Sequence, residues 1–398
     1  MKLKEIDVLF IRQNYPSKIN PVSSNWVFEQ VSLLNKKQVK TLVLSPTPYI
    51  PKILRLLKSN QNYPRFSKAV ENYKGTSVIR PEFIKFPNLY LYSISNKSLQ
   101  KAIMSSSKDI KAKIIHAHFG YDAVASLPLK RKWNVPLIVT FYGGDVKRFP
   151  QSQKNIYSEL VEEADIFLAI SKEMKKDLID LGFPSKKIKV WKLGIDTSLF
   201  QPLEDEIKGK GLNFLTVSRL RDSKRIQDSI LAFKEVNQRF PNTKYTIVGF
   251  GPYESKLKSQ VRDLGLEKNI EFINNLERSR PREVVLNEMQ KADIFLLPTA
   301  PVRRSREGTP LVLIEAQCCG LPSISTNYAG IPEVVVNGKT GFIVDPYDIQ
   351  AMIINMSELV TNSEMREVFS QNSRKHILEH HNQKIQIKKL LRIYEDYL

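Results

Sequence analysis

The residues best suited to do chemistry lie in the segment 306–322, which reads REGTPLVLIEAQCCGLP. It follows an apolar run, Ile294–Leu297, which we expect to be a β-strand, and a polar, basic loop. Thr309 is a favourable N-cap, and Pro310 suits the first position of a helix. The glycine and proline near the end of the segment are typical helix terminators. The sequence therefore predicts a helix over 310–319 whose N-terminus points out of the carboxyl edge of a sheet.

Two carboxylates flank the start of this predicted helix. A helix N-terminus offers unpaired N–H groups and roughly half a positive charge, which suit a diphosphate. Glu307 lies just before the cap, and Glu315 lies about 9 Å beyond it at 1.5 Å per residue. Carboxylates placed on both sides of a phosphate can bind hydroxyl groups of two sugars. The ligand that this pattern describes is a sugar joined through a diphosphate to a ribose.

Basic residues follow an earlier predicted strand, Asn213–Val217, of the same half of the chain. Arg219 lies just beyond that strand and Lys224 opens the next helix, so both side chains can reach the same sheet edge and neutralise a diphosphate. Gly249 and Gly251 lie in the turn after another strand. Such glycines allow the backbone to approach a ligand, or they tighten the turn itself, and the sequence leaves both readings open.

Each of these groups also has a plainer interpretation. Glu307 and Glu315 could be ordinary solvated carboxylates, but the apolar run Leu311–Ile314 between them indicates a buried segment, where a carboxylate needs a partner. The adjacent Cys318 and Cys319 are expected to be inert packing residues. Because they form no disulfide framework, they favour a reducing compartment, and we expect the cytoplasm.

The composition excludes several classes of protein. The chain has 398 residues, of which 42% are hydrophobic and 26% charged, so it is neither disordered, nor collagen-like, nor a disulfide-stapled miniprotein. Its length suggests two or three domains. It contains no run of 18 apolar residues, and charges at Lys2, Lys4, Glu5 and Asp7 interrupt what would be a signal peptide. We therefore expect neither a membrane span nor export.

The positive charge is concentrated in one part of the chain. Of the net charge of +20, residues 1–150 carry +17. Such an excess attracts a polyanion or an anionic membrane, although a solvated lysine-rich surface would look the same. The stretch Tyr49–Lys58 is short, amphipathic and cationic, so it is suited to lie on a membrane or to pack as an ordinary helix.

Apolar runs alternate with amphipathic stretches along the whole chain, the pattern of strands joined by crossover helices in parallel sheets. The order predicts two doubly wound α/β units of about 180 residues each, with a seam near Gly194–Gly211. Ligands of such sheets bind at the carboxyl ends of the strands, so a cleft between two facing sheets is the expected site. The predicted strands are Ile6–Ile11, Val39–Leu44, Ile114–Ala117, Leu137–Thr140, Ile166–Ile170, Ile188–Trp191, Asn213–Val217, Tyr245–Val248, Ile270–Ile273, Ile294–Leu297 and Pro322–Ser325.

Taken together, these motifs resemble glycosyltransferase family 4, the retaining nucleotide-sugar transferases of GT-B fold. The likeness is dense over about 194–345 and looser over 1–193. Among members of this family, the sequence most resembles enzymes that build bacterial cell-surface polysaccharides. The matching elements are Ser218-Arg219-Leu220 with Lys224, the turn Gly249–Pro252, Glu307 with Glu315, Gly320-Leu321-Pro322, Gly330-Ile331-Pro332-Glu333, Asn337-Gly338 with Gly341-Phe342, and the linker from Gly194 to Pro202.

The resemblance implies a nucleotide-sugar site in the second domain. There Glu307 would contact the transferred sugar and Glu315 the ribose, while Arg219 and Lys224 bind the diphosphate. The backbone of Gly308, Thr309, Pro310 and Leu311 would grip the sugar and phosphate, with Gly249 beside them and the base recognised near Asn274. The expected domains are 1–193 for the acceptor, 194–375 for the donor, and a C-terminal helix over 376–398 that could return to the first domain.

The first domain carries family-like pieces with two departures. His118 follows one predicted strand, and Asp145 follows the next. The family often has a histidine near the donor sugar where this chain has Tyr142, and a phenol donates a hydrogen bond but is not a readily protonated base near neutral pH. We expect His118, Tyr142 and Asp145 beside the reacting sugar. The family's glycine-rich first loop is absent, and the backbone N–H groups of Ser23–Asn25 are the candidates to replace it.

The resemblance, together with these residues, implies a hexosyltransferase that needs no cofactor and no metal. It would move a sugar from a nucleotide-diphosphate sugar to a hydroxyl of a lipid-linked glycan, in the cytoplasm or on the inner face of the cell membrane. Two alternatives remain open at this point: another GT-B reaction such as nucleotide-sugar epimerisation, and a basic, non-catalytic nucleic-acid binder. Against the second, residues 1–150 show no recognition motif and no aromatic stacking array.

Overall fold

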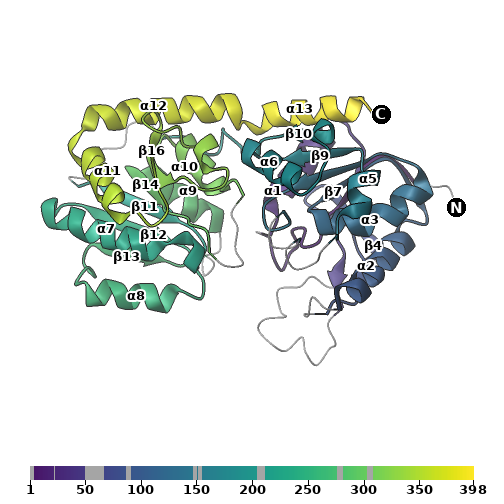
Figure 1. Cartoon of the computed structure of the whole chain (residues 1–398), viewed down its shortest axis with the longest axis horizontal. Helices are drawn as coiled ribbons and strands as arrows, with labels where there is room; N and C mark the ends of the chain where they lie inside the picture. Colours follow the sequence, from purple (N-terminus) through teal and green to yellow (C-terminus); the bar gives the residue numbers. More distant parts are fainter. Residues whose placement is uncertain are drawn as a thin grey trace. The chain divides into compact units, whose positions relative to one another are not determined.

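The computed structural model describes residues 4–21, 23–49, 67–86, 91–146, 150, 155–203, 211–275, 281–302 and 308–398. Contacts divide the chain into two compact units. The first unit comprises Met1–Lys192 together with Lys384–Leu398, and the second comprises Leu193–Gln383. Figure 1 labels many of their helices and strands.

The first unit is built around a mostly parallel sheet in the order β10-β9-β8-β7-β1-β2-β5-β4, in which only β4 runs antiparallel to its neighbour. Its strands are β1 (Lys4–Ile11), β2 (Thr41–Leu44), β4 (Ser67–Tyr73), β5 (Thr76–Arg80), β7 (Ile110–His118), β8 (Leu137–Phe141), β9 (Ile166–Ala169) and β10 (Ile188–Val190), and β3 (Thr47–Pro48) pairs separately with β6 (Glu82–Phe83). Its helices are α1 (Asn25–Lys36), α2 (Tyr92–Ser106), α3 (Gly120–Trp133), α5 (Ser158–Glu163), α6 (Lys172–Asp180) and the C-terminal α13 (Gln383–Glu395).

The second unit has a wholly parallel sheet in the order β13-β12-β11-β14-β15-β16. Its strands are β11 (Asn213–Val217), β12 (Lys244–Val248), β13 (Ile270–Ile273), β14 (Ile294–Leu297), β15 (Ser323–Thr326) and β16 (Gly341–Val344). Its helices are α7 (Ile226–Arg239), α8 (Glu254–Asp263), α9 (Pro281–Lys291), α10 (Leu311–Cys318), α11 (Ile349–Thr361) and α12 (Ser363–His380), with short 3-10 turns η5 (Asp222–Lys224) and η7 (Ile331–Glu333).

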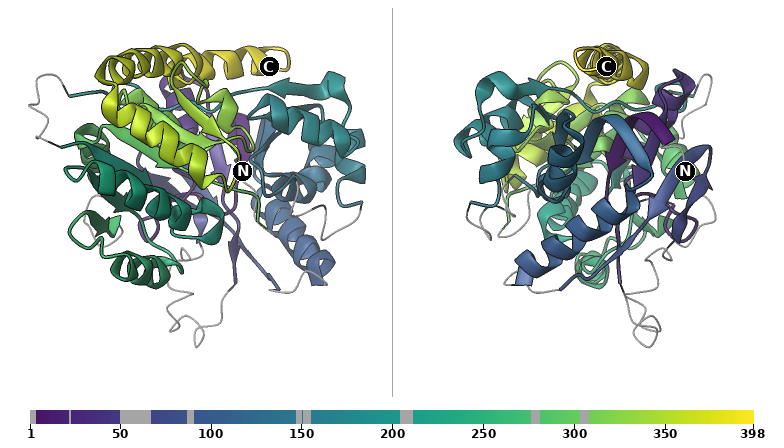
Figure 2. Two further views of the ribbon diagram at one scale, coloured as in Figure 1. Left: turned by 60° about the vertical axis from the view of Figure 1, so that its left-hand side comes forward. Right: turned by 90° about the vertical axis from the view of Figure 1, so that its right-hand side faces the viewer.

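Alternate side chains of the second sheet enter a hydrophobic core formed with α7, α8 and α11. Phe214, Tyr245 and Leu296 belong to this cluster, whereas Leu215 and Phe295 point to the opposite face. Helices α9 and α10 contact the strands but contribute no residue to the cluster, so they cover that other face. In the left view of Figure 2, the yellow-green α11 lies against the green strands.

Each sheet has a point where the strand order reverses. In the first sheet β1 lies between β7 and β2, and in the second β11 lies between β14 and β12. The loops that follow two neighbouring strands diverge at such a point, which leaves a crevice at their carboxyl ends. The residues after β1 and β7, and those after β11 and β14, are therefore the ones that the fold brings to a binding position.

Every strand predicted from the sequence is present, with ends that differ by four residues or fewer. One expectation needs correction. The single C-terminal helix over 376–398 is wrong, because α12 ends at His380 and α13 begins at Gln383. The edge hairpin of β4 and β5 was not foreseen. The predicted segment Tyr49–Lys58 lies, after Tyr49, outside the described residues.

Candidate functional site

In the second unit, the loops after β11 and β14 are tied together. The backbone N–H of Ala300 donates to the carbonyl of Ser223 at 3.0 Å, so the loop after β14 rests on η5. Lys224 ends η5 and is partly buried, while Arg219 is exposed with its guanidinium carbon 5.8 Å from the centre of the Phe250 ring. The two predicted phosphate-binding cations therefore lie on the loop at the strand-order reversal.

The glycine turn after β12 supports this loop through the backbone. The N–H of Leu220 donates to the carbonyl of Phe250 at 2.9 Å. A Cβ on Gly249 would lie 1.9 Å from the carbonyl oxygen of Ser218, and one on Gly251 would lie 2.4 Å from that of Leu220. Both glycines are therefore needed for close packing against the Arg219 loop, whatever else they contact. Asn274, at the end of β13, is partly buried.

Helix α10 begins one residue later than predicted, because Thr309 is not its N-cap. The cap is Pro310, and no side chain caps the helix. Thr309 is buried, and its hydroxyl oxygen has no hydrogen-bond partner among the described residues. Gly308 and Leu311 are partly buried, as is Glu315 in the second turn. Glu307 and the loop residues 303–306 lie outside the described residues.

The opposite end of α10 serves a structural purpose. Gly320 has φ +78°, and the N–H of Leu321 donates to the carbonyl of Ala316, which ends the helix as predicted. Arg374 of α12 donates to the carbonyls of Cys318 (2.6 Å) and Phe200 (2.5 Å).

Cys318 and Cys319 are buried, and burial raises the pKa of their thiols to about 11 and about 12, so both are inert at neutral pH.

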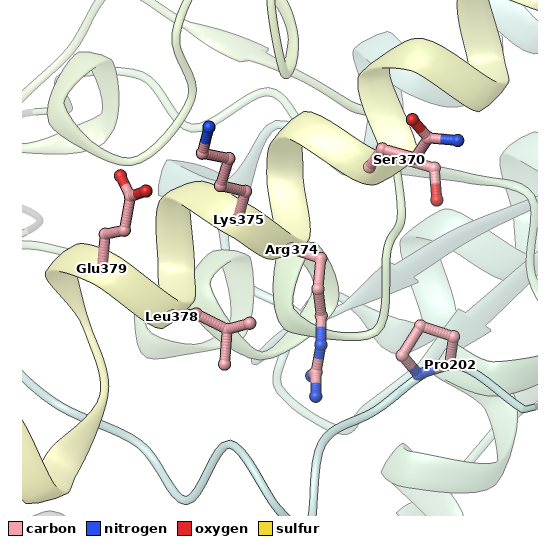
Figure 3. A pocket seen from close by; sticks show the side chains of 7 residues that line it. Pro202, Ser370, Arg374, Lys375, Leu378 and Glu379 are labelled. Atoms are coloured by element: carbon pink, nitrogen blue, oxygen red, sulfur yellow. The ribbon is translucent and has the colours of Figure 1, made fainter.

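A surface groove of about 520 Å³ lies beside this C-terminal end of α10. It is lined by Pro202, Ser370, Gln371, Arg374, Lys375, Leu378 and Glu379. Figure 3 shows Arg374 extending from α12 toward the segment that carries Pro202, while Lys375 points elsewhere. Since the guanidinium is already engaged by backbone carbonyls, and the groove is at the wrong end of the helix for an anion, we assign it no role.

In the first unit, His118 and Tyr142 are in direct contact. Nδ1 of His118 lies 2.6 Å from the phenolic oxygen of Tyr142, whose ring stacks on Phe119. The His118 ring is fully buried and stacks on His116 with 4.4 Å between centroids. Burial, with the nearby His116 and Arg12, holds the pKa of His118 well below its usual range. The imidazole is therefore neutral near pH 7.

Asp145 does not point its carboxylate at an open space. It accepts hydrogen bonds from the backbone N–H groups of Gly120 (3.1 Å), Tyr142 (3.1 Å) and Gly143 (2.9 Å). Burial raises the pKa of its carboxyl group, although these N–H groups oppose that effect. The geometry makes Asp145 the residue that joins the loop after β7 to the loop after β8.

Sequence reasoning missed a buried cluster around Arg12 at the end of β1. Its guanidinium lies 4.0 Å from the centre of the Phe119 ring and donates to the hydroxyls of Ser24 (3.0 Å) and Tyr121 (3.1 Å). Asp122 pairs with it at 3.5 Å. Burial raises the pKa of Asp122 to about 6. An arginine directly after an apolar strand was the available signal.

Arg12 also contacts the start of α1. Its side chain donates to the hydroxyl of Ser24, the N-cap of α1, whose backbone is left-handed with φ 49°. The hydroxyl of Ser24 therefore faces the guanidinium and makes no capping bond to the helix. This leaves the start of α1, where Ser23–Asn25 were predicted to present N–H groups, held in place by a buried charge.

Two general features bear on partners. Among the described residues, no helix is long and apolar enough to cross a membrane. Within the same ranges, no group of three or more His, Cys, Asp or Glu side chains is placed to hold a metal ion.

Two models of known protein families match this chain. Residues 201–376 match the model described as glycosyl transferases group 1. Residues 44–199 match the model described as glycosyltransferase family 4.

Curated relatives are similar over much of their length. The chain is 30% identical over 288 residues to the amylovoran biosynthesis glycosyltransferase of Erwinia amylovora, covering 69% of this chain and 70% of that one. It is 26% identical over 379 residues to a putative teichuronic acid biosynthesis glycosyltransferase of Bacillus subtilis, covering 91% and 90%.

Solved structures share the fold. Sucrose-phosphate synthase from Thermosynechococcus elongatus superimposes with a TM-score of 0.78 at 16% identity, over 98% of both chains. The Anabaena protein HepE, solved with UDP and glucose, gives 0.74 at 15% identity, over 98% of this chain and 99% of that one. The predicted two Rossmann-like α/β domains are thereby confirmed, and the reading of the chain as a non-catalytic protein is set aside. The chain belongs to glycosyltransferase family 4, has the GT-B fold and is a glycosyltransferase.

Proposed function

We propose that the protein transfers a sugar from a nucleoside diphosphate to a hydroxyl of a growing glycan, with retention of configuration. One observation carries this proposal: α10 starts at the strand-order reversal of the second sheet, next to a buried Thr309 hydroxyl that has no partner among the described residues. An unsatisfied buried hydroxyl beside helix N–H groups suits a ligand rich in oxygen acceptors. Phosphates and sugar hydroxyls both meet that description.

Each candidate residue has a role in this scheme. Arg219, Lys224 and the first turn of α10 stabilise the negative charge that develops on the leaving diphosphate, so catalysis is mainly electrostatic and positional. Glu307 orients the transferred sugar and Glu315 binds the ribose. The backbone of 308–311 holds the sugar and phosphate, and the base lies near Asn274.

Retention follows if the acceptor attacks from the face of the leaving group. The bond from the anomeric carbon to the diphosphate oxygen breaks as the bond to the acceptor oxygen forms. The acceptor's proton passes to the diphosphate, which leaves as a nucleoside diphosphate. Arginine, lysine and helix N–H groups supply the positive charge that this step needs, so we propose that no metal or cofactor takes part.

The relatives support a biological setting for this reaction. Their names place the Erwinia and Bacillus proteins in amylovoran and teichuronic acid synthesis, and HepE was solved with UDP and glucose. We extend this to a nucleotide-sugar donor and a lipid-linked glycan acceptor for the present chain, in the cytoplasm.

A membrane-facing surface on the first unit would bring the enzyme to such an acceptor. Four exposed apolar side chains belong to the first turn of α2 and to the segment before it: Ile84 (53%), Phe86 (38%), Leu91 (37%) and Ile94 (50%). The segment that carries Ile84 and Phe86 is fixed to the helix, because their N–H groups donate to hydroxyls of α2. With the net charge of +17 over residues 1–150, this surface suits an anionic bilayer.

The membrane proposal is tested by co-sedimentation with vesicles. We expect binding to vesicles containing phosphatidylglycerol but not to neutral phosphatidylcholine vesicles. The double variant Ile84→Ser and Phe86→Ser should bind less, whereas Ile354→Ser, at a side chain 66% exposed in the second unit, should bind like wild type. Equal binding by the double variant would contradict the proposed surface.

The donor is tested first by thermal unfolding with a panel of nucleotide sugars. A ligand at 100 times its dissociation constant stabilises the folded state by about 2.7 kcal/mol. The stabilising donor is then incubated with a membrane extract from cells that make the polysaccharide, and the anomeric configuration of the product is read by NMR. Isomerised donor without transfer, or an inverted product, would refute the proposal.

A further inference from the structure

The two ring nitrogens of the buried His118 imidazole have different surroundings. Nδ1 is engaged by the Tyr142 hydroxyl at 2.6 Å. Nε2 is buried and has no hydrogen-bond partner among the described residues. Buried polar atoms are nearly always paired, so an isolated one just after a strand at the strand-order reversal is a candidate contact for a ligand atom.

The protonation state of the ring limits what Nε2 can do. The ring is fully buried, and neighbouring His116 and Arg12 further disfavour its charged form. A neutral imidazole carries one N–H, so one nitrogen donates and the other accepts. The partner of Nδ1 therefore decides which role remains for Nε2.

The hydroxyl of Tyr142 is the partner of Nδ1, so it determines which ring nitrogen carries the hydrogen. Burial raises the pKa of its phenol, so the hydroxyl keeps its proton near neutral pH. A phenol O–H is a stronger acid than an imidazole N–H, and an imidazole nitrogen is the better acceptor, so the proton of the 2.6 Å contact lies on the tyrosine side. Nδ1 accepts, and the ring's single hydrogen is on Nε2.

The ring cannot easily turn to exchange these roles. His118 stacks on His116 on one side, with Phe10 5.6 Å and Tyr142 5.9 Å away between ring centroids. Rotation of the imidazole would remove Nδ1 from the hydroxyl and bury two unpaired nitrogens. The aromatic neighbours and the phenol therefore fix one orientation.

We propose that His118 donates its Nε2–H to an oxygen atom of the bound substrate, and that Tyr142 is the positioning residue that fixes this tautomer. The identity of the substrate rests on the proposed sugar transfer, and the oxygen belongs to a hydroxyl of either the donor sugar or the acceptor. In this role His118 orients a hydroxyl and is not the base that deprotonates it. The tyrosine at this position is then a functional part of the site.

The tautomer is tested without any substrate, by NMR of the full chain labelled with ¹⁵N in its five histidines. Two-bond nitrogen–proton correlations distinguish the two neutral tautomers, and His118→Gln assigns the signal. We expect the Nε2–H form with no titration between about pH 6 and 8, the range in which an ordinary histidine changes charge. An Nδ1–H form, or protonation within that range, would overturn the proposal.

Adding each substrate then identifies the oxygen atom that accepts the Nε2–H hydrogen bond. A shift of the Nε2–H proton on adding the nucleotide sugar places that oxygen on the donor. A shift only when the acceptor glycan is added places it on the acceptor. No shift with either substrate, under conditions where turnover is measured, would refute the contact. Because the tautomer needs no turnover, failure of the proposed transferase activity remains distinguishable from failure of this inference.

Variants separate donation from a structural role. Tyr142→Phe keeps the ring that stacks on Phe119 but releases the tautomer, so kcat/KM should fall about 10-fold, while Tyr397→Phe should match wild type. A glutamine at position 118 can place an amide N–H near the Nε2 position, whereas an asparagine reaches only the Nδ1 position. His118→Gln should therefore retain more activity than His118→Asn. Equal loss in these two variants, or full activity of Tyr142→Phe, would contradict the donor role.

Discussion

Nδ1 of His116 lies 2.6 Å from the phenolic oxygen of Tyr394, although 278 positions separate the two residues in the chain. Nε2 of the same ring lies 2.8 Å from the hydroxyl of Thr140. A helix at the C-terminal end, α13, is thereby joined to the middle of the first sheet at β7 and β8. His116 in turn stacks on His118, so the last helix supports the candidate site through the His116 ring.

Replacing Tyr394 by phenylalanine should weaken the first unit. The substitution leaves a buried imidazole nitrogen unpaired, at a cost of about 1–3 kcal/mol in the free energy of unfolding. Urea unfolding followed by tryptophan fluorescence measures this unit alone, because Trp26, Trp133 and Trp191 all lie within it. Tyr397→Phe, three residues on and partly exposed, is the matched control. A Tyr394→Phe midpoint equal to that of the control would contradict the account.

The stability of the first unit should fall as the solution is acidified below about pH 6.5. Burial lowers the pKa of His116 from 6.5 to about 3, so between these values the unfolded chain binds a proton that the folded one does not, and stability rises with pH. His118 acts in the same direction, whereas Asp122, with its raised pKa, opposes them.

The contribution of His116 is isolated by His116→Gln. Stability curves of the variant and wild type, measured by urea unfolding at a series of pH values, cancel the contributions of the other groups. The variant's slope should be smaller by up to about 1.4 kcal/mol per pH unit. Parallel curves would show that the folded state protonates His116 as readily as the unfolded one.

Gly249→Ala should disrupt the loop that carries Arg219. The new methyl would lie 1.9 Å from a backbone carbonyl, and Gly249 has φ +153°, which alanine rarely adopts. Gly265→Ala is the control, since that glycine also has a positive φ but open space around it. Calorimetry should show a large loss of stability for the first variant and a loss of about 1 kcal/mol for the second. Similar transitions for both would argue against the close packing.

Arg219→Ala should weaken binding of the nucleotide-sugar donor without unfolding the second unit. Losing a charge-assisted hydrogen bond of about 1.5–3 kcal/mol lowers affinity about 10- to 150-fold. Arg221→Ala removes the same charge from an exposed side chain two residues along and should cost far less. Titration calorimetry with the donor compares them, and equal losses would mean that only the local net charge matters.

Much of the fold was predictable because its signals are local. Buried parallel strands are continuous apolar runs, and β11, β13 and β14 have the predicted ends. The edge strand β4 was missed because its sequence, SKAVENY, is polar enough to resemble a loop. Residues 349–380 form two helices because Asp348 and Asn362 cap them with their side chains, a signal that was present but not used.

The site was predictable in its residue types and less so in its contacts. Arg219 and Lys224 follow a strand, and their place at the sheet edge follows from topology alone. The hydrogen bond between His118 and Tyr142, and the buried Arg12 beside them, join loops of different strands. Such contacts depend on side-chain packing between segments distant in sequence, which periodicity does not encode. The Thr309 hydroxyl, which has no partner among the described residues, likewise depends on how the chain packs around the start of α10.

The central claim is that the first turn of α10 and the loop after β11 hold a nucleotide diphosphate. Amide hydrogen exchange with and without saturating nucleoside diphosphate sugar tests it directly. We expect slower exchange in 308–315 and 219–225, with no comparable change in α12. Tight binding that leaves both segments exchanging as in the free protein would place the ligand elsewhere and contradict the account.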